Sequence, residues 1–155
     1  MTYFDRIRSG AFVIKDKKIL LFKRPQGYWY FPEGKIENNE TAEHAAIRET
    51  KEETGIKIKI KKLLYVHELR KKDHRTIELI YLAKPIGGKF RKGIDPRENK
   101  RLVELKYMPL TSISKLDFLF PNVTTKVKND IKNEFRNCPR GTGISKVNLK
   151  KLLGK

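Results

Sequence analysis

The chain has 155 residues, 38% of them hydrophobic, and a formal net charge of +18. This length and composition suit one domain with one core, and no apolar run approaches the roughly 18 residues of a membrane-spanning helix. The single cysteine, Cys138, excludes an internal disulfide. Together with an N-terminus that lacks the pattern of a secretory signal, it leads us to expect a cytoplasmic protein.

The first half of the chain is predicted to form strands around a single helix. Alternating apolar residues predict strands, and clusters of Gly and Pro predict loops. By these signals the elements are strands at 8–14 and 19–24, a loop at 26–34, a helix at 41–54 and a strand at 56–68. The helix has Asn39 or Thr41 as its N-cap and ends at Gly55, a residue suited to the left-handed conformation of a helix end.

The second half is predicted to add strands and a C-terminal helix. The elements are strands at 75–84 and 102–108 and a helix at 121–135. Apolar residues recur at four-residue spacing on that helix and form its buried face: Val123, Val127, Ile131 and Phe135. This order predicts an α/β fold with one domain at 1–136. The basic segment 137–155 contains no acid and is expected to be a tail, flexible or in contact with RNA.

Residues 48–53 concentrate charge on the predicted helix. Positions three and four apart share a helical face, so Glu49, Glu52 and Glu53 project to the same side. Three carboxylates within one turn repel each other unless a cation lies between them. An all-oxygen ligand set favours Mg²⁺ or Mn²⁺, which commonly bridge proteins to phosphates. The pattern predicts metal-assisted phosphate chemistry, and the alternative is a solvated acidic face.

The segment from Gly34 to Ile56 matches the signature of the Nudix hydrolases. The matching positions are Gly34, Glu40, Arg48, Glu49, Glu52, Glu53, Gly55 and Ile56. Thr50 departs from the pattern, because an aliphatic residue is commoner there. A solvated acidic face explains neither the two glycines nor Arg48 at their offsets, so the chain resembles this family. The resemblance covers about residues 6–135. It implies an α/β/α sandwich with a central mixed sheet, the motif loop and helix on one side and the C-terminal helix on the other.

The resemblance also implies roles for individual residues. The expected metal ligands are Gly34, through its carbonyl, and Glu49, Glu52 and Glu53. Arg48 is expected to hold the crowded carboxylates in register by charge-assisted hydrogen bonds, and Glu40 resembles an orienting acid. The general base in this family varies. Here it is Glu49 or an acid on the later loop at 84–100, which offers Glu98 and Asp95, with Glu104 on the next strand.

Substrate contacts are expected in the loop before the motif and beside it, from Arg24, Trp29, Tyr30 and Lys35. An aromatic ring in that loop can stack on a base, and packing beneath the motif loop is the alternative for Trp29. The activity implied is a Mg²⁺-dependent pyrophosphohydrolase, in which water attacks phosphorus. Its substrate would be a nucleoside diphosphate linked to another group, such as a nucleoside triphosphate or a dinucleoside polyphosphate.

Two alternatives remain within this resemblance. Glu33-Gly34 stands where many members have Gly-Gly, and this form resembles the branch acting on dinucleoside polyphosphates or triphosphorylated RNA ends. The tyrosine often found beyond the motif in that branch is absent. The alternatives are an RNA 5′-end pyrophosphohydrolase and a non-catalytic module that binds nucleotide or RNA. Intact carboxylates favour an enzyme. The oligomeric state, monomer or homodimer, stays open, and no membrane partner is expected.

Charge is distributed unevenly along the chain. Seven of the 18 acids lie within residues 33–53, so the remainder is more basic than the net charge suggests. A compact acidic site within a basic surface attracts polyanions. Heat adaptation is the alternative explanation of a lysine-rich composition. The basic residues that we expect to flank the site are Lys84, Lys89, Arg91, Lys92, Arg97, Lys100 and Arg101.

Overall fold

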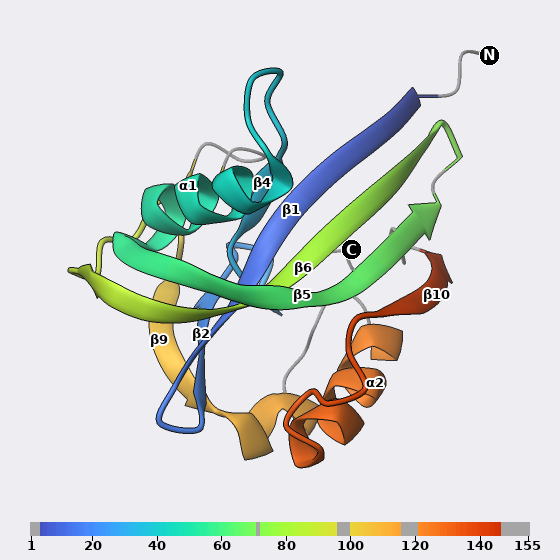
Figure 1. The fold of residues 1–155 in the computed structure, drawn as a ribbon. Coiled ribbons are helices and arrows are strands. Elements are labelled where there is room, and N and C mark those ends of the chain that lie inside the picture. The colour runs from blue at the N-terminus through green and yellow to red at the C-terminus, as the bar shows by residue number, and fades with distance from the viewer. Residues whose placement is uncertain (1–3, 71, 96–99, 116–120, 147–155) are drawn as a thin grey trace.

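The computed structural model describes residues 4–70, 72–95, 100–115 and 121–146. In chain order (Figure 1) the elements are β1 (Phe4–Lys15), β2 (Lys18–Lys23), β3 (Trp29–Tyr30), β4 (Glu33–Lys35), α1 (Ala42–Thr54), β5 (Ile56–Arg70), β6 (His74–Gly88), β7 (Ile94–Asp95), β8 (Lys100–Arg101), β9 (Glu104–Pro109), the 3-10 helix η1 (Leu110–Lys115), α2 (Pro121–Lys132) and β10 (Arg140–Lys146). The predicted strands and helices are all present. β1, β5 and β6 are longer than predicted, and the predicted loop at 26–34 contains β3 and the start of β4. No helix in the described ranges is both long enough and apolar enough to cross a bilayer.

The main sheet is mixed, with the strand order β10-β5-β6-β1-β2-β3. β1 runs parallel to β6, and β5 runs antiparallel to β6. The other edge of β1 is shared between two strands. Residues 8–10 pair with β4, and residues 14–15 pair with β2, which pairs in turn with β9. This sharing places β4 against the middle of β1, where β4 also contacts α1.

The two faces of the sheet carry separate cores. Side chains alternate along a strand, and on β1 Ala11 and Val13 pack in one cluster with Ala46 of α1. Phe12 points the other way and packs in a cluster with Val127 of α2. In Figure 1, α1 and α2 accordingly lie on opposite sides of β5 and β6. The predicted arrangement of helices on both sides of a mixed sheet is therefore present.

Helix α1 begins and ends at residues that cap it. The Thr41 hydroxyl accepts a hydrogen bond from the His44 amide at 3.2 Å. Gly55 has φ 76°, a conformation that glycine adopts without strain, and its amide donates to the Lys51 carbonyl at 2.9 Å. Ala46 is fully buried, and this small side chain lets the helix lie close to the sheet. The caps at Thr41 and Gly55 and the burial of Ala46 thus fix which face of α1 lies toward the sheet and which residues face β4.

The C-terminal part differs from the prediction in two ways. Helix α2 ends at Lys132, before the predicted end, because Glu134 and Phe135 adopt positive φ values of 51° and 57°. Val127 and Phe135 are buried as expected, whereas the side chain of Val123 lies outside the described residues. The segment 140–146, expected to lie in a tail, instead forms β10 and pairs in parallel with β5. The boundary placed after residue 136 therefore does not mark the end of the sheet.

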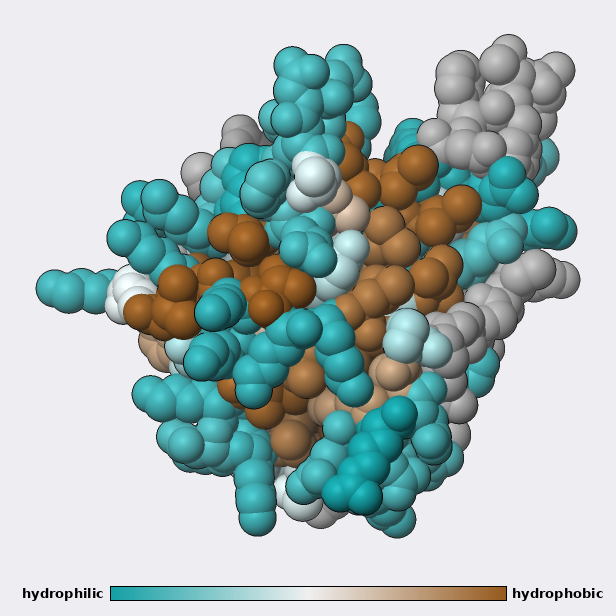
Figure 2. Space-filling view, viewed as in Figure 1, coloured by the Kyte–Doolittle hydropathy of each residue, from teal (hydrophilic) through white to brown (hydrophobic). Residues whose placement is uncertain are grey.

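Apolar side chains reach the visible surface in several places, one of which is an area on the sheet beside α1 (Figure 2). Figure 2 shows this area over β1, β6 and β5. Two of its large side chains are exposed, Ile7 by 50% and Val66 by 40%. Ile7, Leu79 and Val66 share the face that carries α1, because the register pairs Ser9 with Leu79 and Leu79 with Val66. Helix α1 therefore covers only part of its face of the sheet.

Candidate active site

A pocket of about 660 Å³ lies where α1, β4, the middle of β1 and the segment after β6 meet. Its volume is within the range of small-molecule sites. The lining is almost entirely charged, unlike that of an apolar ligand pocket. It consists of Arg8, Glu33, Gly34, Lys35, Glu37, Arg48, Glu49, Glu52, Glu53, Arg91, Lys92 and Gly93.

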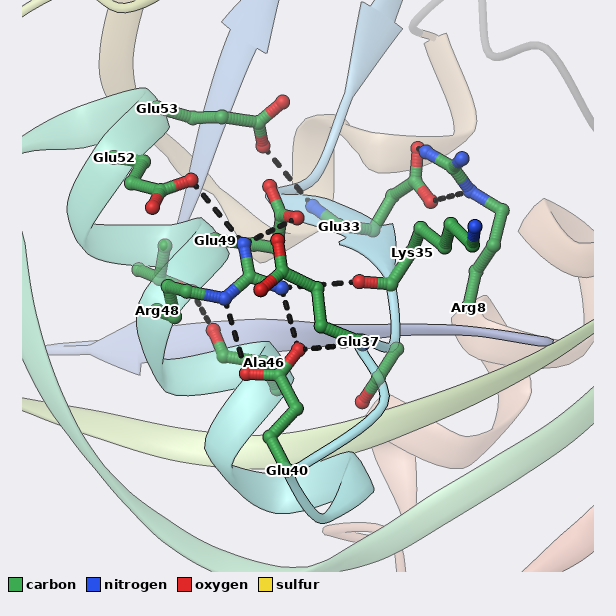
Figure 3. Close-up of polar contacts among 12 residues, drawn as sticks. Arg8, Glu33, Lys35, Glu37, Glu40, Ala46, Arg48, Glu49, Glu52 and Glu53 are labelled. Carbon is green, nitrogen blue, oxygen red and sulfur yellow. Dashed lines mark hydrogen bonds and ion pairs between the residues drawn. The ribbon is translucent and has the colours of Figure 1, made fainter.

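The three helical carboxylates share this pocket as their spacing predicts. Figure 3 shows Glu49, Glu52 and Glu53 projecting from α1 toward β4. The observed position of Glu49 depends on glycine at position 34, since a Cβ there would lie within 2.5 Å of the Cδ and both oxygens of Glu49. This close approach brings the backbone of β4 directly beside the carboxylate of Glu49.

Arg48 connects three of the acids to the loop before the helix. Its Nη1 donates to Glu49 at 2.8 Å and to Glu52 at 3.3 Å. Its Nε and Nη2 bind the two oxygens of Glu40 at 3.0 and 2.6 Å, a bidentate pair. Nη2 also donates to the carbonyl of Lys35 at 3.0 Å. The hydrogen bonds from Arg48, with one from the amide of Glu37, lower the pKa of Glu40 to about 2.

Burial disfavours the charged form of two of the carboxylates. Glu53 is 6% exposed, and burial followed by the charge of Glu33 raises its pKa well above the ordinary value. Burial also raises the pKa of Glu49, against the opposing effect of Arg48. Neighbouring anions add to burial in both cases. A bound cation would reverse this balance, because it attracts the charged form.

Glu33 ties the pocket to the core beneath it. Its amide donates to the Glu53 carboxylate at 3.0 Å, so its backbone orients that side chain. Its own carboxylate receives hydrogen bonds from Nε and Nη2 of Arg8 at 2.5 and 2.8 Å. On the other side lies Arg24, 3.5 Å away and packed 5.2 Å from the ring centroids of Phe22 and Tyr30. Two arginines therefore hold Glu33 in place.

The predicted substrate contacts divide into one pocket residue and three core residues. Lys35 is exposed and lines the pocket. Arg24 and Tyr30 are each 1% exposed and Trp29 is 9% exposed, and none of them lines it. Tyr30 stacks on Phe31, and Lys106 covers the ring of Trp29. These three side chains are buried and packed against other residues in this structure, and their contact with substrate stays a prediction.

The segment after β6 closes one wall of the pocket. Its residues Arg91, Lys92 and Gly93 are lining residues, in agreement with the prediction that basic residues there flank the site. The candidate base Glu98 and the flanking Arg97 lie outside the described residues. Glu104 on β9 forms an ion pair with Lys106 at 2.5 Å and does not line the pocket.

Arg8 is a pocket residue that the sequence analysis missed. A signal was present: β1 alternates, and Arg8 has the parity of Phe12, which points into the core. A charged residue at an inward strand position requires a buried partner, and Glu33 supplies it. The parity of β1 together with an acid beside Gly34 could have indicated this pair.

The donor set fits a hard divalent cation, although the side chains are paired with protein groups as they stand. Within the described ranges no three acidic, imidazole or thiol side chains form a ready-made metal cluster. Glu49 and Glu52 are turned to Arg48, and Glu53 is turned to the amide of Glu33. All available ligands are oxygens, which Mg²⁺ and Mn²⁺ prefer. A metal bound here would take carboxylate oxygens from these partners.

Comparison with known proteins agrees with this geometry. Residues 5–127 match the model of the NUDIX domain family. An ADP-ribose pyrophosphatase from Methanocaldococcus jannaschii is 37% identical over 118 residues, which cover 72% of this chain and 66% of that protein. An RNA pyrophosphohydrolase from Haemophilus influenzae is 40% identical over 92 residues, which cover 56% of this chain and 46% of that protein. The chain thus spans less than two thirds of the length of these relatives.

Solved structures show the same fold. A NUDIX hydrolase from Nitrosomonas europaea superposes with a TM-score of 0.68 and 27% identity, covering 91% of this chain and 78% of its own. A MutT NUDIX hydrolase from Burkholderia pseudomallei gives a TM-score of 0.65 and 29% identity, covering 83% of this chain and 98% of its own. The predicted fold class, an α/β fold with helices packed on a mixed sheet, is confirmed by these matches.

Proposed function

The chain belongs to the Nudix family, and from this premise and the pocket we propose that it is a Mg²⁺-dependent pyrophosphohydrolase. Its substrate is a nucleoside diphosphate linked to another group, cleaved at a phosphoanhydride by water attack on phosphorus. The observation that carries the proposal is the convergence of Glu49, Glu52 and Glu53 with Gly34 in one charged pocket. This class of substrate is supported by the relatives, which are named as an ADP-ribose pyrophosphatase and an RNA pyrophosphohydrolase.

The residues of the pocket divide the work. Glu49, Glu52, Glu53 and the Gly34 carbonyl hold Mg²⁺, or Mn²⁺ in its place, which when bound polarises the phosphates and lowers the pKa of water. Arg48 keeps Glu49 and Glu52 apart and in register. The amide of Glu33 orients the Glu53 carboxylate at 3.0 Å. Lys35 binds phosphate oxygens of the substrate, and the proton of the attacking water goes to Glu49 or Glu98.

Burial of Glu53 gives the site a reason to require a cation. A carboxylate that is 6% exposed and lies near Glu33 is unfavourable when charged. Without a counter-ion it tends to take up a proton. With a divalent cation, the charged form becomes the ligand and the repulsion among the three acids is relieved. Relief of this repulsion therefore favours metal binding.

An RNA 5′-end pyrophosphohydrolase is the second candidate, since it uses the same chemistry on a triphosphorylated end. The similarity to the Haemophilus influenzae RNA pyrophosphohydrolase favours it, as does the net charge of +18. A non-catalytic binding module is the third, and it has no use for three mutually repelling carboxylates. The first two candidates differ in substrate and the third differs in having no turnover.

A substrate panel tests the proposal. ADP-ribose, a nucleoside triphosphate, a dinucleoside tetraphosphate and 5′-triphosphorylated RNA would be incubated with the protein, with Mg²⁺ or with excess chelator, and the products separated by chromatography. We expect cleavage at a phosphoanhydride for at least one substrate, and only with the metal. Binding of nucleotide or RNA without cleavage of any substrate would instead establish the non-catalytic module.

A further inference from the structure

The segment 89–93 is fixed to the end of α1 that carries the carboxylates. The amide of Arg91 donates to the Thr54 carbonyl and the amide of Gly93 donates to the Glu53 carbonyl, both at 2.9 Å. Carbonyls at a helix C-terminus lack partners within the helix, so these amides satisfy them. A Cβ at Gly93 would lie 2.8 Å from the Glu53 Cα, and glycine is therefore needed for this contact.

Arg91 and Lys92, on this fixed backbone, line the pocket. Lys92 Nζ donates to the Val103 carbonyl at 3.3 Å, which restrains the side chain, and no carboxylate of the described residues pairs with it. Arg91 also forms no ion pair with any residue in the described ranges. On the β4 side of the pocket, the amine of Lys35 likewise has no carboxylate partner there. By contrast, Arg8 and Arg48 are both bound to acids.

The pocket thus holds cations of two kinds. Those paired with Glu33, Glu40, Glu49 and Glu52 organise the site. The charges of Lys35, Arg91 and Lys92 are left for an anion that enters from outside. Two of these three lie together on the segment fixed to Glu53, where like charges repel each other until an anion binds.

We propose that Arg91 and Lys92 form a phosphate-binding arm that makes this site selective for substrates with three or more consecutive phosphates. The inference rests on the proposed function. The carboxylate face of α1 serves the two phosphates of the anhydride that is cleaved. The arm binds the next phosphate in the chain, which a dinucleotide or nucleotide sugar with two phosphates lacks. A nucleoside triphosphate, a dinucleoside tetraphosphate and a triphosphorylated RNA end all carry this group.

The competing explanation is that these residues are part of a generally basic surface. Lys89 provides the matched control, because it lies on the same segment and is exposed but does not line the pocket. The experiment compares Arg91→Gln/Lys92→Gln with Lys89→Gln, measuring kcat/KM with Mg²⁺ for ADP-ribose and for ATP. If Arg91 and Lys92 contact a third phosphate, the loss of kcat/KM should be greater for ATP than for ADP-ribose. If they only add to a basic surface, the loss should be the same for both substrates.

We expect the double variant to lose at least about tenfold more kcat/KM on ATP than on ADP-ribose, as removal of charge-assisted hydrogen bonds to one phosphate implies. Lys89→Gln should change both values by less than about twofold, in keeping with a charge that lies outside the pocket. Equal losses of kcat/KM on the two substrates, or the same pattern in Lys89→Gln, would refute the proposal that Arg91 and Lys92 bind a third phosphate.

Binding supplies a readout that does not depend on turnover. Calorimetry with Mg²⁺ would compare inorganic tripolyphosphate with pyrophosphate as probes. The parent should bind tripolyphosphate more tightly, and the double variant should lose that preference. If the parent cleaves no substrate but prefers tripolyphosphate, the proposed function is refuted and the phosphate-binding role of Arg91 and Lys92 stands. A parent that cleaves nucleotides but binds both probes equally would refute the arm alone.

Discussion

Replacing Gly34 by alanine should remove activity without unfolding the protein. The new Cβ would lie within 2.5 Å of the Glu49 carboxylate atoms, whereas ordinary contact begins at 3.4 Å. The nearest of these atoms, Cδ and Oε1, would lie 2.0 Å from the new Cβ, so the carboxylate must move by at least 1.4 Å, the difference between 2.0 and 3.4 Å. A displacement of about 1 Å at a catalytic group costs on the order of 10²-fold in rate. The atoms that move are the end of a flexible side chain, so the fold has little reason to change.

The assay measures kcat, the Kd for Mg²⁺ and the Tm of Gly34→Ala beside the parent. We expect kcat to fall about 10²-fold and Mg²⁺ to bind more weakly, with a Tm close to that of the parent in chelator. A variant with parental kcat would refute the reasoning, since Glu49 would then not need its observed position. A large fall in Tm in chelator would show that Gly34 serves the fold.

Three further predictions concern Mg²⁺ binding, the pairing of Arg48 and the buried His67. Mg²⁺ at about 100 times its Kd should stabilise the protein by about 2.7 kcal/mol and raise the Tm by roughly 5–10 °C; an unchanged Tm in a protein that binds Mg²⁺ would contradict this. Arg48→Lys keeps the charge but loses the bidentate pairing with Glu40, so kcat should fall about tenfold or more, and parental turnover would exclude a positioning role. Burial, assisted by the charge of Lys126, lowers the pKa of His67 from 6.5 to about 4, so the unfolded chain binds the proton more tightly and stability falls as pH drops from about 6.5 toward 4. The loss is roughly 3 kcal/mol at most, and the Tm of His67→Gln should fall less than that of the parent over this range.

The acidic face and its helix could be predicted because their causes are local. Thr41 and Gly55 bound the helix through contacts within four residues, and the helical period alone brings Glu49, Glu52 and Glu53 to one side. The contact between α1 and β4 was harder to predict from the sequence, although the glycine at position 34 indicates that another group lies close to it. Its lack of a side chain is explained only by the carboxylate group that lies beside it.

Burial of Arg24 and Tyr30 could not be predicted because it depends on contacts distant in the chain. Tyr30 donates to Glu78 at 3.3 Å, 48 residues away, and no local pattern around the loop indicates that partner. An aromatic residue and an arginine before a phosphate motif suit a substrate contact and a core contact equally well. In this structure the guanidinium of Arg24 packs against Phe22 and Tyr30, which makes it a core contact.

Strand β10 was missed for a different reason. Its sequence, Arg-Gly-Thr-Gly-Ile-Ser-Lys, has two glycines and no alternation of apolar residues, so strand propensity is low. Its pairing with β5 arises because β5 would otherwise be an open edge of the sheet, and edges recruit nearby segments. Such pairing is a property of the assembled sheet, and a local pattern in residues 140–146 does not encode it.

Turnover of Glu53→Gln with saturating Mg²⁺ tests the central claim most directly. Glutamine keeps the shape of Glu53 and removes the charge that would bind the cation. The matched control is Glu43→Gln on the same helix, where the side chain is exposed and lies outside the pocket. We predict that kcat falls by about 10²- to 10³-fold or more in Glu53→Gln, with the fold retained and Glu43→Gln unaffected. A Glu53→Gln protein that turns over at the parental rate would contradict a metal-dependent hydrolase built on this carboxylate.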